Sequence, residues 1–131
     1  MSYSSTSVVQ ISAGGYHTLV LKSDGTVWAW GRNHLGQCGN GTTNDTEKLT
    51  QVVGLNNITA ISAGLYYNMA LKNDGTVWSW GYNGNGQLGD GTTTQKEIPV
   101  QVSGLTGVSA IYAGWYHSMA LKSNGTMGLG K

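Results

Sequence analysis

Residues 63–81 read Ala-Gly-Leu-Tyr-Tyr-Asn-Met-Ala-Leu-Lys-Asn-Asp-Gly-Thr-Val-Trp-Ser-Trp-Gly, and the same pattern begins at Ala13 and again at Ala113. Segments 11–60 and 61–110 align without a gap and are identical at 27 of 50 positions. A period near 50 with strand-like content is typical of β-propellers, in which each repeat is one blade that needs neighbours to cover its faces. The repeat therefore predicts an all-β chain of four-stranded antiparallel propeller blades.

Turn chemistry and alternation locate the four strands of one repeat. An inner strand of small residues is expected at 57–64, where a ring is crowded, and strands at 68–72 and 76–81 should form a hairpin. Asp74-Gly75 joins that hairpin, because glycine accepts the positive φ of a tight turn. The fourth strand, at 98–102, contains Pro99, which lacks an N–H donor. We therefore expect this strand at the outer edge of the blade.

Composition and charge exclude several classes of protein. The 131 residues include 21 glycines, no phenylalanine and 10% charged residues, with a formal net charge of +1. Basic residues are spread thinly, so we expect no nucleic-acid partner. No apolar run approaches the roughly 20 residues that span a bilayer, and no signal peptide is expected at the start, so we expect no membrane partner. The single Cys38 leaves the redox compartment, and with it the localisation, undetermined.

The repeat resembles a known family. Its pattern, Ala-Gly-x-Tyr-His-x-x-x-Leu-Lys-x-Asp-Gly-Thr-Val-x-x-Trp-Gly-x-Asn-x-x-Gly-Gln-Leu-Gly-x-Gly, matches 13–41, 63–91 and part of 113–126. This looks like the repeat of the regulator of chromosome condensation family, which implies seven-bladed propellers, and it is similar to repeats of a bacterial secreted β-lactamase inhibitor. Tyr67 stands where the motif has His, and Cys38 where it has Leu. Both departures are interpreted as packing variants.

The repeat divides the chain into a tail with the start of the first strand (1–10), repeats 11–60 and 61–110, and a partial repeat 111–131. A ring of about seven blades needs roughly 350 residues, so about 2.6 blades per chain cannot close alone. We expect the ring to be completed by missing sequence or by a homo-oligomer. Three copies would supply enough blades, so a trimer is the expected oligomer.

The last five residues, 127–131, depart from the register of the repeat. Met-Gly-Leu-Gly-Lys stands where Val-Trp-Ala-Trp-Gly is expected, and a two-base loss in the codons of the expected strand would produce that ending. We therefore expect the third repeat to be truncated or frame-shifted after Thr126, with a divergent terminal strand as the alternative.

The residues that could take part in catalysis or metal binding are not expected to form a site. Equivalent positions in separate blades hold His17 and His117 apart, so a hydrogen-bonding role is expected instead of a metal site. Cys38 is expected to replace a packing leucine. Two glycine patterns, 84–89 and 125–131, resemble phosphate-binding loops but lack a following helix. We therefore expect no catalytic residue, no cofactor and no metal.

Aromatic residues separate into core and surface candidates. Trp28, Trp30, Trp78 and Trp80 lie two apart on strands and are expected to pack between blades. Large amphipathic side chains in the turns after the inner strands should cluster on one face of the ring, where such residues are favoured binding anchors. The candidate partner-binding residues are Tyr16, Leu65, Tyr66, Tyr67, Trp115 and Tyr116.

The sequence thus predicts a non-catalytic repeat module that binds a protein partner through loops on one propeller face, that self-assembles, or both. The alternative functions follow from the resemblance alone. They are a regulatory propeller like the nucleotide-exchange scaffold of the family's namesake, and a binder like the β-lactamase inhibitor.

Overall fold

The computed structural model describes residues 6–125 and 127–128, and these residues are all-β, as predicted. The strands are β1 (Val8–Ala13), β2 (His17–Lys22), β3 (Val27–Gly31), β4 (Thr46–Gln51), β5 (Ile58–Ala63), β6 (Tyr67–Lys72), β7 (Val77–Gly81), β8 (Lys96–Gln101), β9 (Val108–Ala113), β10 (Ser118–Lys122) and β11 (Met127–Gly128). No helix in this part of the chain is long and apolar enough to cross a membrane.

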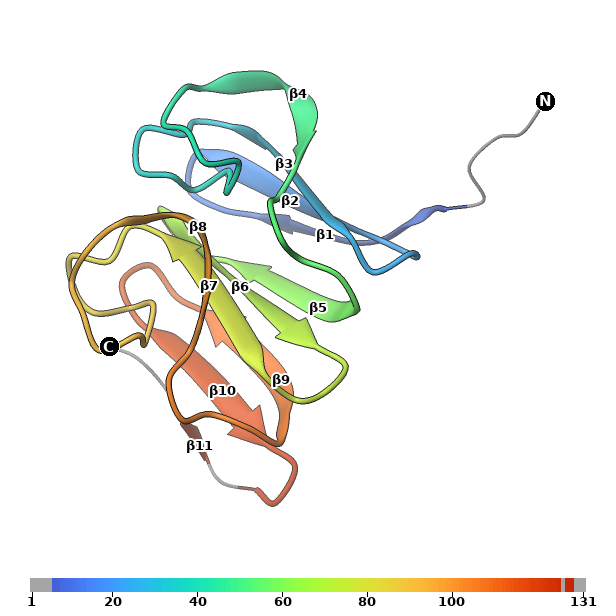
Figure 1. Cartoon of the computed structure of the whole chain (residues 1–131), viewed down its shortest axis with the longest axis vertical. Coiled ribbons are helices and arrows are strands. Elements are labelled where there is room, and N and C mark those ends of the chain that lie inside the picture. Colours follow the sequence, from blue (N-terminus) through green and yellow to red (C-terminus); the bar gives the residue numbers. More distant parts are fainter. Residues whose placement is uncertain (1–5, 126, 129–131) are drawn as a thin grey trace.

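The strands form three antiparallel sheets, which we call blades 1, 2 and 3. Blade 1 has the order β1-β2-β3-β4, blade 2 the order β5-β6-β7-β8, and blade 3 joins β9, β10 and β11. The blades follow one another in space as they do in sequence, from blade 1 at the top of Figure 1 to blade 3 at the bottom. The innermost strands β1, β5 and β9 are neighbours across the blades. Blades 1 and 2 confirm the predicted four-stranded blades, and the described part of blade 3 is incomplete, as expected.

The predicted hairpins are present. In the β2–β3 turn, the backbone N–H and hydroxyl of Thr26 both donate to Oδ1 of Asp24, at 3.1 and 2.6 Å. Gly25 has a φ of 83°, in the region that glycine enters without strain. Asp74 and Thr76 repeat these contacts in the β6–β7 turn. The Asp-Gly-Thr sequence therefore fixes each turn through one carboxylate.

Pro99 lies on β8, which is the last strand of its sheet, so the predicted outer edge is confirmed. The missing N–H of proline removes no ladder bond on the open side of such a strand. The ending after Thr126 lies mostly outside the described residues. Only Met127 and Gly128 are described there, and their backbone pairs with Leu121 and Ala120 of β10.

Two buried clusters hold the three blades together. The cluster between blades 1 and 2 joins one face of blade 1, including Leu19 and Cys38, to Ile61 and Trp80 of blade 2. The cluster between blades 2 and 3 repeats this arrangement, with Tyr67, Met69, Leu71 and Leu88 of blade 2 facing Val108, Ile111 and Ala120 of blade 3. Each blade therefore supplies one face to the next, as repeat architectures require.

The tryptophan prediction is confirmed at the junction between blades 1 and 2. Trp80 is completely buried there, and its indole N–H donates to the backbone oxygen of Gln37 at 3.1 Å. Trp78 is half-buried and packs against the same cluster. Trp30 occupies the equivalent place in blade 1 but is 38% exposed. The reason is that, in this structure, no blade lies against that face of blade 1.

Buried polar loops connect β3 to β4 and β7 to β8. The side-chain amide of Asn83 donates to the backbone oxygens of Thr92 and Thr94, both at 3.0 Å, while its oxygen accepts from the backbone N–H of Leu88. Asn33 makes the equivalent contacts in blade 1. Because each buried Asn side chain satisfies three backbone groups of the loop, the glycine-rich loop is closed without a helix or a strand.

Candidate partner-binding face

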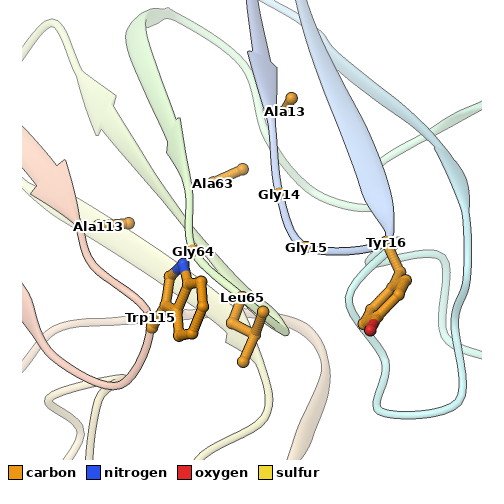
Figure 2. Close-up of a pocket in the computed structure, with 9 residues that line it drawn as sticks. All are labelled: Ala13, Gly14, Gly15, Tyr16, Ala63, Gly64, Leu65, Ala113 and Trp115. Carbon is orange, nitrogen blue, oxygen red and sulfur yellow. The ribbon is translucent and has the colours of Figure 1, made fainter.

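The candidate face is built from the turns that follow the inner strands. Residues 14–16 join β1 to β2, residues 64–66 join β5 to β6, and residues 114–117 join β9 to β10. The backbone N–H of Gly15 donates to the oxygens of Gly64 and Leu65, at 3.2 and 3.1 Å, and so ties the first turn to the second. The three turns therefore lie in a row across the blades, as Figure 2 shows.

Close approach of these turns explains the Ala-Gly sequence that begins each of them. A Cβ added at Gly64 would overlap the ring of Tyr67 and lie 2.6 Å from the carbonyl oxygen of Gly114 in the next blade. The same atom at Gly14 would overlap His17 and lie 2.7 Å from the oxygen of Gly64. Glycine is thus required at both turns by space, and not by an unusual φ.

An open pocket of about 510 Å³ lies along this row of turns. It is lined by small residues at and after the ends of the inner strands and by three larger side chains: Ala13, Gly14, Gly15, Ala63, Gly64 and Ala113, with Tyr16, Leu65 and Trp115. In Figure 2 the indole of Trp115 lies next to the side chain of Leu65, while Tyr16 lies farther along the row. Pockets with apolar walls and a few polar groups are the usual form of a binding site.

Aromatic rings continue from the pocket across blades 1 and 2. The rings of Tyr16 and Tyr66 stack with centroids 5.6 Å apart and an interplanar angle of 16°, and Tyr82 meets Tyr66 edge-on at 6.5 Å. The guanidinium of Arg32 lies 5.1 Å from the centre of the Tyr16 ring. Sequence reasoning missed Arg32 and Tyr82. Their equivalent positions, directly after the Trp-x-Trp-Gly strand ends, are the signal that could have found them.

Five of the six predicted residues lie on this face. Trp115 is 70% exposed, Tyr16 and Tyr116 are also exposed, and Leu65 and Tyr66 are half-buried.

Tyr67 is placed differently, because its side chain is fully buried at the junction of blades 2 and 3. Its hydroxyl donates to the backbone oxygen of His117, and burial raises the pKa of the phenol. A partner could not reach this ring without separating the blades. The ring of Tyr67 therefore does not belong to the exposed face.

The equivalent residue of blade 1, His17, is also buried and has the hydrogen-bonding role that the sequence predicted. Its Nε2 and Oδ1 of Asn68 are 2.6 Å apart, and the amide nitrogen of Asn68 donates to the backbone oxygen of Gln37. Burial lowers the pKa of His17, although the bond to Asn68 opposes that shift. The described residues hold no group of three or more His, Cys, Asp or Glu placed to bind a metal.

Cys38 packs as the predicted substitute for leucine. It is completely buried in the cluster between blades 1 and 2, where Leu88 holds the equivalent place in the next cluster. Burial, together with the nearby carboxylate of Asp45, raises the pKa of the thiol to about 11. A thiol with so high a pKa is protonated at neutral pH and is a poor nucleophile.

Repeated antiparallel sheets, side by side around neighbouring inner strands, define the chain as a run of β-propeller blades. The family model described as "Regulator of chromosome condensation (RCC1) repeat" matches residues 24–71 and 74–121. A second model with the same description matches residues 8–37 and 58–87. The chain belongs to this repeat family, as the resemblance implied. The resemblance to the β-lactamase inhibitor stays a prediction.

Known relatives share this repeat within much longer chains. The chain is 46% identical over 48 residues to the human E3 ubiquitin-protein ligase HERC2, covering 37% of this chain and 1% of HERC2. It is 40% identical over 42 residues to the guanine nucleotide exchange factor SRM1 of Saccharomyces cerevisiae, covering 32% of this chain and 9% of SRM1. The chain thus spans less than a tenth of either relative.

Solved structures support the same fold. Human WBSCR16 superposes with a TM-score of 0.80 at 25% identity, covering 93% of this chain and 33% of that one. Prp20p from Saccharomyces cerevisiae, described with its binding to Gsp1p and histones, gives a TM-score of 0.75 at 29% identity, covering 96% and 31%. The chain corresponds to about a third of each of these propellers.

Proposed function

We propose that the chain is a non-catalytic propeller module that binds a protein partner through the face formed by the three inner turns. The observation that supports this most directly is Trp115, a 70% exposed indole that lines the pocket. Equivalent positions in the other two turns hold Gly15 and Leu65, so the scaffold stays fixed while this side chain varies. An exposed tryptophan at the edge of a cavity is a typical anchor for a protein partner.

The chemistry of the face favours a partner with few charges. Tyr16 and Tyr66 present stacked rings, and the larger side chains that line the pocket are aromatic or aliphatic. The guanidinium of Arg32 lies against the Tyr16 ring. Aromatic side chains with one bracing arginine form a stiff surface that loses little conformational entropy on binding.

Affinity capture with matched variants tests the proposal. The chain and a Tyr16→Ala/Trp115→Ala double variant are immobilised and exposed to lysate of the source organism, and bound proteins are quantified by mass spectrometry. Both side chains are exposed, so the double variant should keep its circular dichroism spectrum. We expect loss of the specifically captured protein. Ile98→Ala is the control, because Ile98 is also an exposed apolar residue but lies on outer strand β8.

A partner retained by the double variant, or lost equally with Ile98→Ala, would contradict binding through this face. The binding of Prp20p to Gsp1p and histones suggests relatives of these proteins as candidates to include in the capture, and the weakly charged face favours the former over the strongly basic histones. The exchange-scaffold and inhibitor functions rest on resemblance alone, and no feature of the described residues favours them over partner binding.

We also propose, as a second candidate function, that the chain associates with copies of itself. This is supported by exposed large apolar side chains on the outward faces of blades 1 and 3, among them Ile11 and Leu121. Multi-angle light scattering on the purified chain is the test. A mass of two or more chains is expected, and the mass of a single chain at all concentrations would contradict it.

A further inference from the structure

Blades 1 and 3 each have one face that no other blade covers in this structure, which we call the outward face. Because the chain is a repeat, each outward face can be compared with the equivalent face of a blade that is packed. Ile11, Ile61 and Ile111 are equivalent residues on the inner strands. Ile61 and Ile111 are buried against the preceding blade, with 2% and 7% exposure, but Ile11 is 63% exposed. Val8 and Trp30 show the same contrast with their buried equivalents Ile58 and Trp80. The outward face of blade 1 therefore has the side chains of a packed junction without its partner.

Blade 3 presents part of the complementary half of that junction, since its described residues include no equivalents of Cys38, Val52 and Leu55, which blade 1 contributes to its junction with blade 2. Its strand β10 carries Met119 and Leu121, which are 36% and 38% exposed. The equivalent residues of blade 2, Met69 and Leu71, are buried against blade 3. Those of blade 1, Leu19 and Leu21, are buried against blade 2. Along strand β10, the outward face of blade 3 thus matches the face that a following blade covers elsewhere in the chain.

From this match we propose that copies of the chain associate head to tail, with the outward face of blade 1 of one copy packed on the outward face of blade 3 of another. The inference rests on the self-association proposed above and specifies its geometry. The interface is heterologous, because the two contacting surfaces differ and each copy keeps one of each kind. Ile11 and Trp30 of one copy contact Met119 and Leu121 of the next.

Continuity with the internal junctions identifies the occupant as a second copy. The apolar residues of the two faces have the same type as residues that pack against each other between blades 1 and 2 and between blades 2 and 3. A formal net charge of +1 with 10% charged residues also means that copies repel one another weakly.

Backbone contacts can be repeated across the new junction. Inside the chain, the N–H groups of Ile58 and Val108 each donate at 3.1 Å to a hairpin carbonyl of the preceding blade, on Gly25 and Gly75. The equivalent pair between copies is the N–H of Val8 with the carbonyl of Gly125. This contact would fix the register of the two copies, since each inner strand starts at a hairpin of the blade before it.

A serine hydrogen bond is one of the contacts that are not repeated. Ser12 and Ser62 accept hydrogen bonds from the N–H groups of Ala63 and Ala113 at 2.9 Å, but the third equivalent position holds Tyr112. Tyr112 is 54% exposed on the inner strand of blade 3. The junction between copies therefore replaces a serine hydrogen bond with an aromatic contact and is not identical to the internal junctions.

Two blocked variants test the head-to-tail geometry. Ile11→Arg blocks the blade 1 face and Leu121→Arg blocks the blade 3 face, and both residues are exposed, so each variant should fold. Each variant alone is expected to lose the assembled mass at concentrations where the unchanged chain assembles. An equimolar mixture should give the mass of two chains and nothing larger, because one intact face of each kind remains. Val53→Arg, at an exposed loop position, is the control that should still assemble.

The possible failures are distinct. If the unchanged chain has the mass of a single chain, self-association itself is wrong. If it assembles but one of the two variants still assembles alone, the interface joins like faces and the head-to-tail geometry is overturned. The geometry is also overturned if the mixture stays at the mass of one chain.

Discussion

Nε2 of His17 in blade 1 lies 2.6 Å from Oδ1 of Asn68 in blade 2, and both side chains are buried. The amide nitrogen of Asn68 donates to the backbone oxygen of Gln37, which assigns its Oδ1 as an acceptor and His17 Nε2 as the donor. The other ring nitrogen, Nδ1, is buried and has no hydrogen-bond partner in the described structure. The seam between the two blades therefore contains a neutral histidine.

This histidine makes stability depend on pH. Burial lowers the pKa of His17 below its ordinary value of 6.5, so the unfolded chain binds a proton that the folded chain does not. The stabilisation is complete above about pH 6.5 and is lost as the pH falls towards the folded pKa. We expect a lower urea midpoint at pH 5.5 than at pH 7.5. His17→Gln should flatten this dependence, whereas exposed His34→Gln should keep it. An unchanged pH profile in His17→Gln would contradict the assignment.

Trp80 and Trp30 are equivalent residues, so substituting each one measures how much burial between blades stabilises the fold. Trp80→Ala removes a completely buried indole and should lower the free energy of unfolding by about 3–5 kcal/mol. Trp30→Ala should lower it by clearly less in dilute protein, because that ring is already partly exposed. Urea denaturation of both variants is the measurement. Equal losses would show that burial between blades does not stabilise the fold as argued.

Gly64 tests the close approach of the inner turns. Gly64→Ala places a methyl group against Tyr67 and the carbonyl of Gly114, and should destabilise the chain by about 1–3 kcal/mol. Gly84→Ala is the control, since the atoms nearest to a Cβ there belong to the movable end of the Tyr82 side chain, and the equivalent residue of blade 1 is His34. The midpoints of thermal unfolding of the two variants measure this difference in stability. A neutral Gly64→Ala would mean that the turns can separate freely.

Asn83 tests the organisation of the β7–β8 loop. Asn83→Ala leaves the backbone groups of Leu88, Thr92 and Thr94 without their partner, which should lower the free energy of unfolding by about 1–3 kcal/mol. Exposed Asn85→Ala is the matched control and should change it little. Chemical denaturation gives both values, and similar losses in the two variants would count against the buried role of Asn83.

Strand positions and turns could be predicted from the sequence because they depend on local chemistry that recurs every fifty residues. Asp74-Gly75 forms a hairpin through its own carboxylate and a positive φ, and Pro99 is excluded from inner strands by its missing donor. The roles of Asn33 and Asn83 were missed. From the sequence, a polar residue in a glycine-rich loop is expected to be exposed to solvent. Only the three-dimensional path of the loop shows that these side chains are buried beneath it.

The candidate face was predicted less completely, and Tyr67 shows why. Tyrosine is amphipathic, so its type is compatible with either a surface or a junction. Its register was the better guide, because the equivalent His17 was already interpreted as a hydrogen-bonding residue inside the blade. Arg32 and Tyr82 were missed because their contacts with Tyr16 and Tyr66 join segments that only the folded turns bring together.

Blade 2 is the one blade of the described chain with a neighbour on both faces, since blade 1 covers Ile61 and Trp80 while blade 3 covers Met69 and Leu71. Repeat proteins open from the units that have fewest neighbour contacts. Amide hydrogens of β6 should therefore exchange with deuterium more slowly than those of β2 or β10. The middle of the sequence would then be the last part of the molecule to open, and fraying would start from both outer blades.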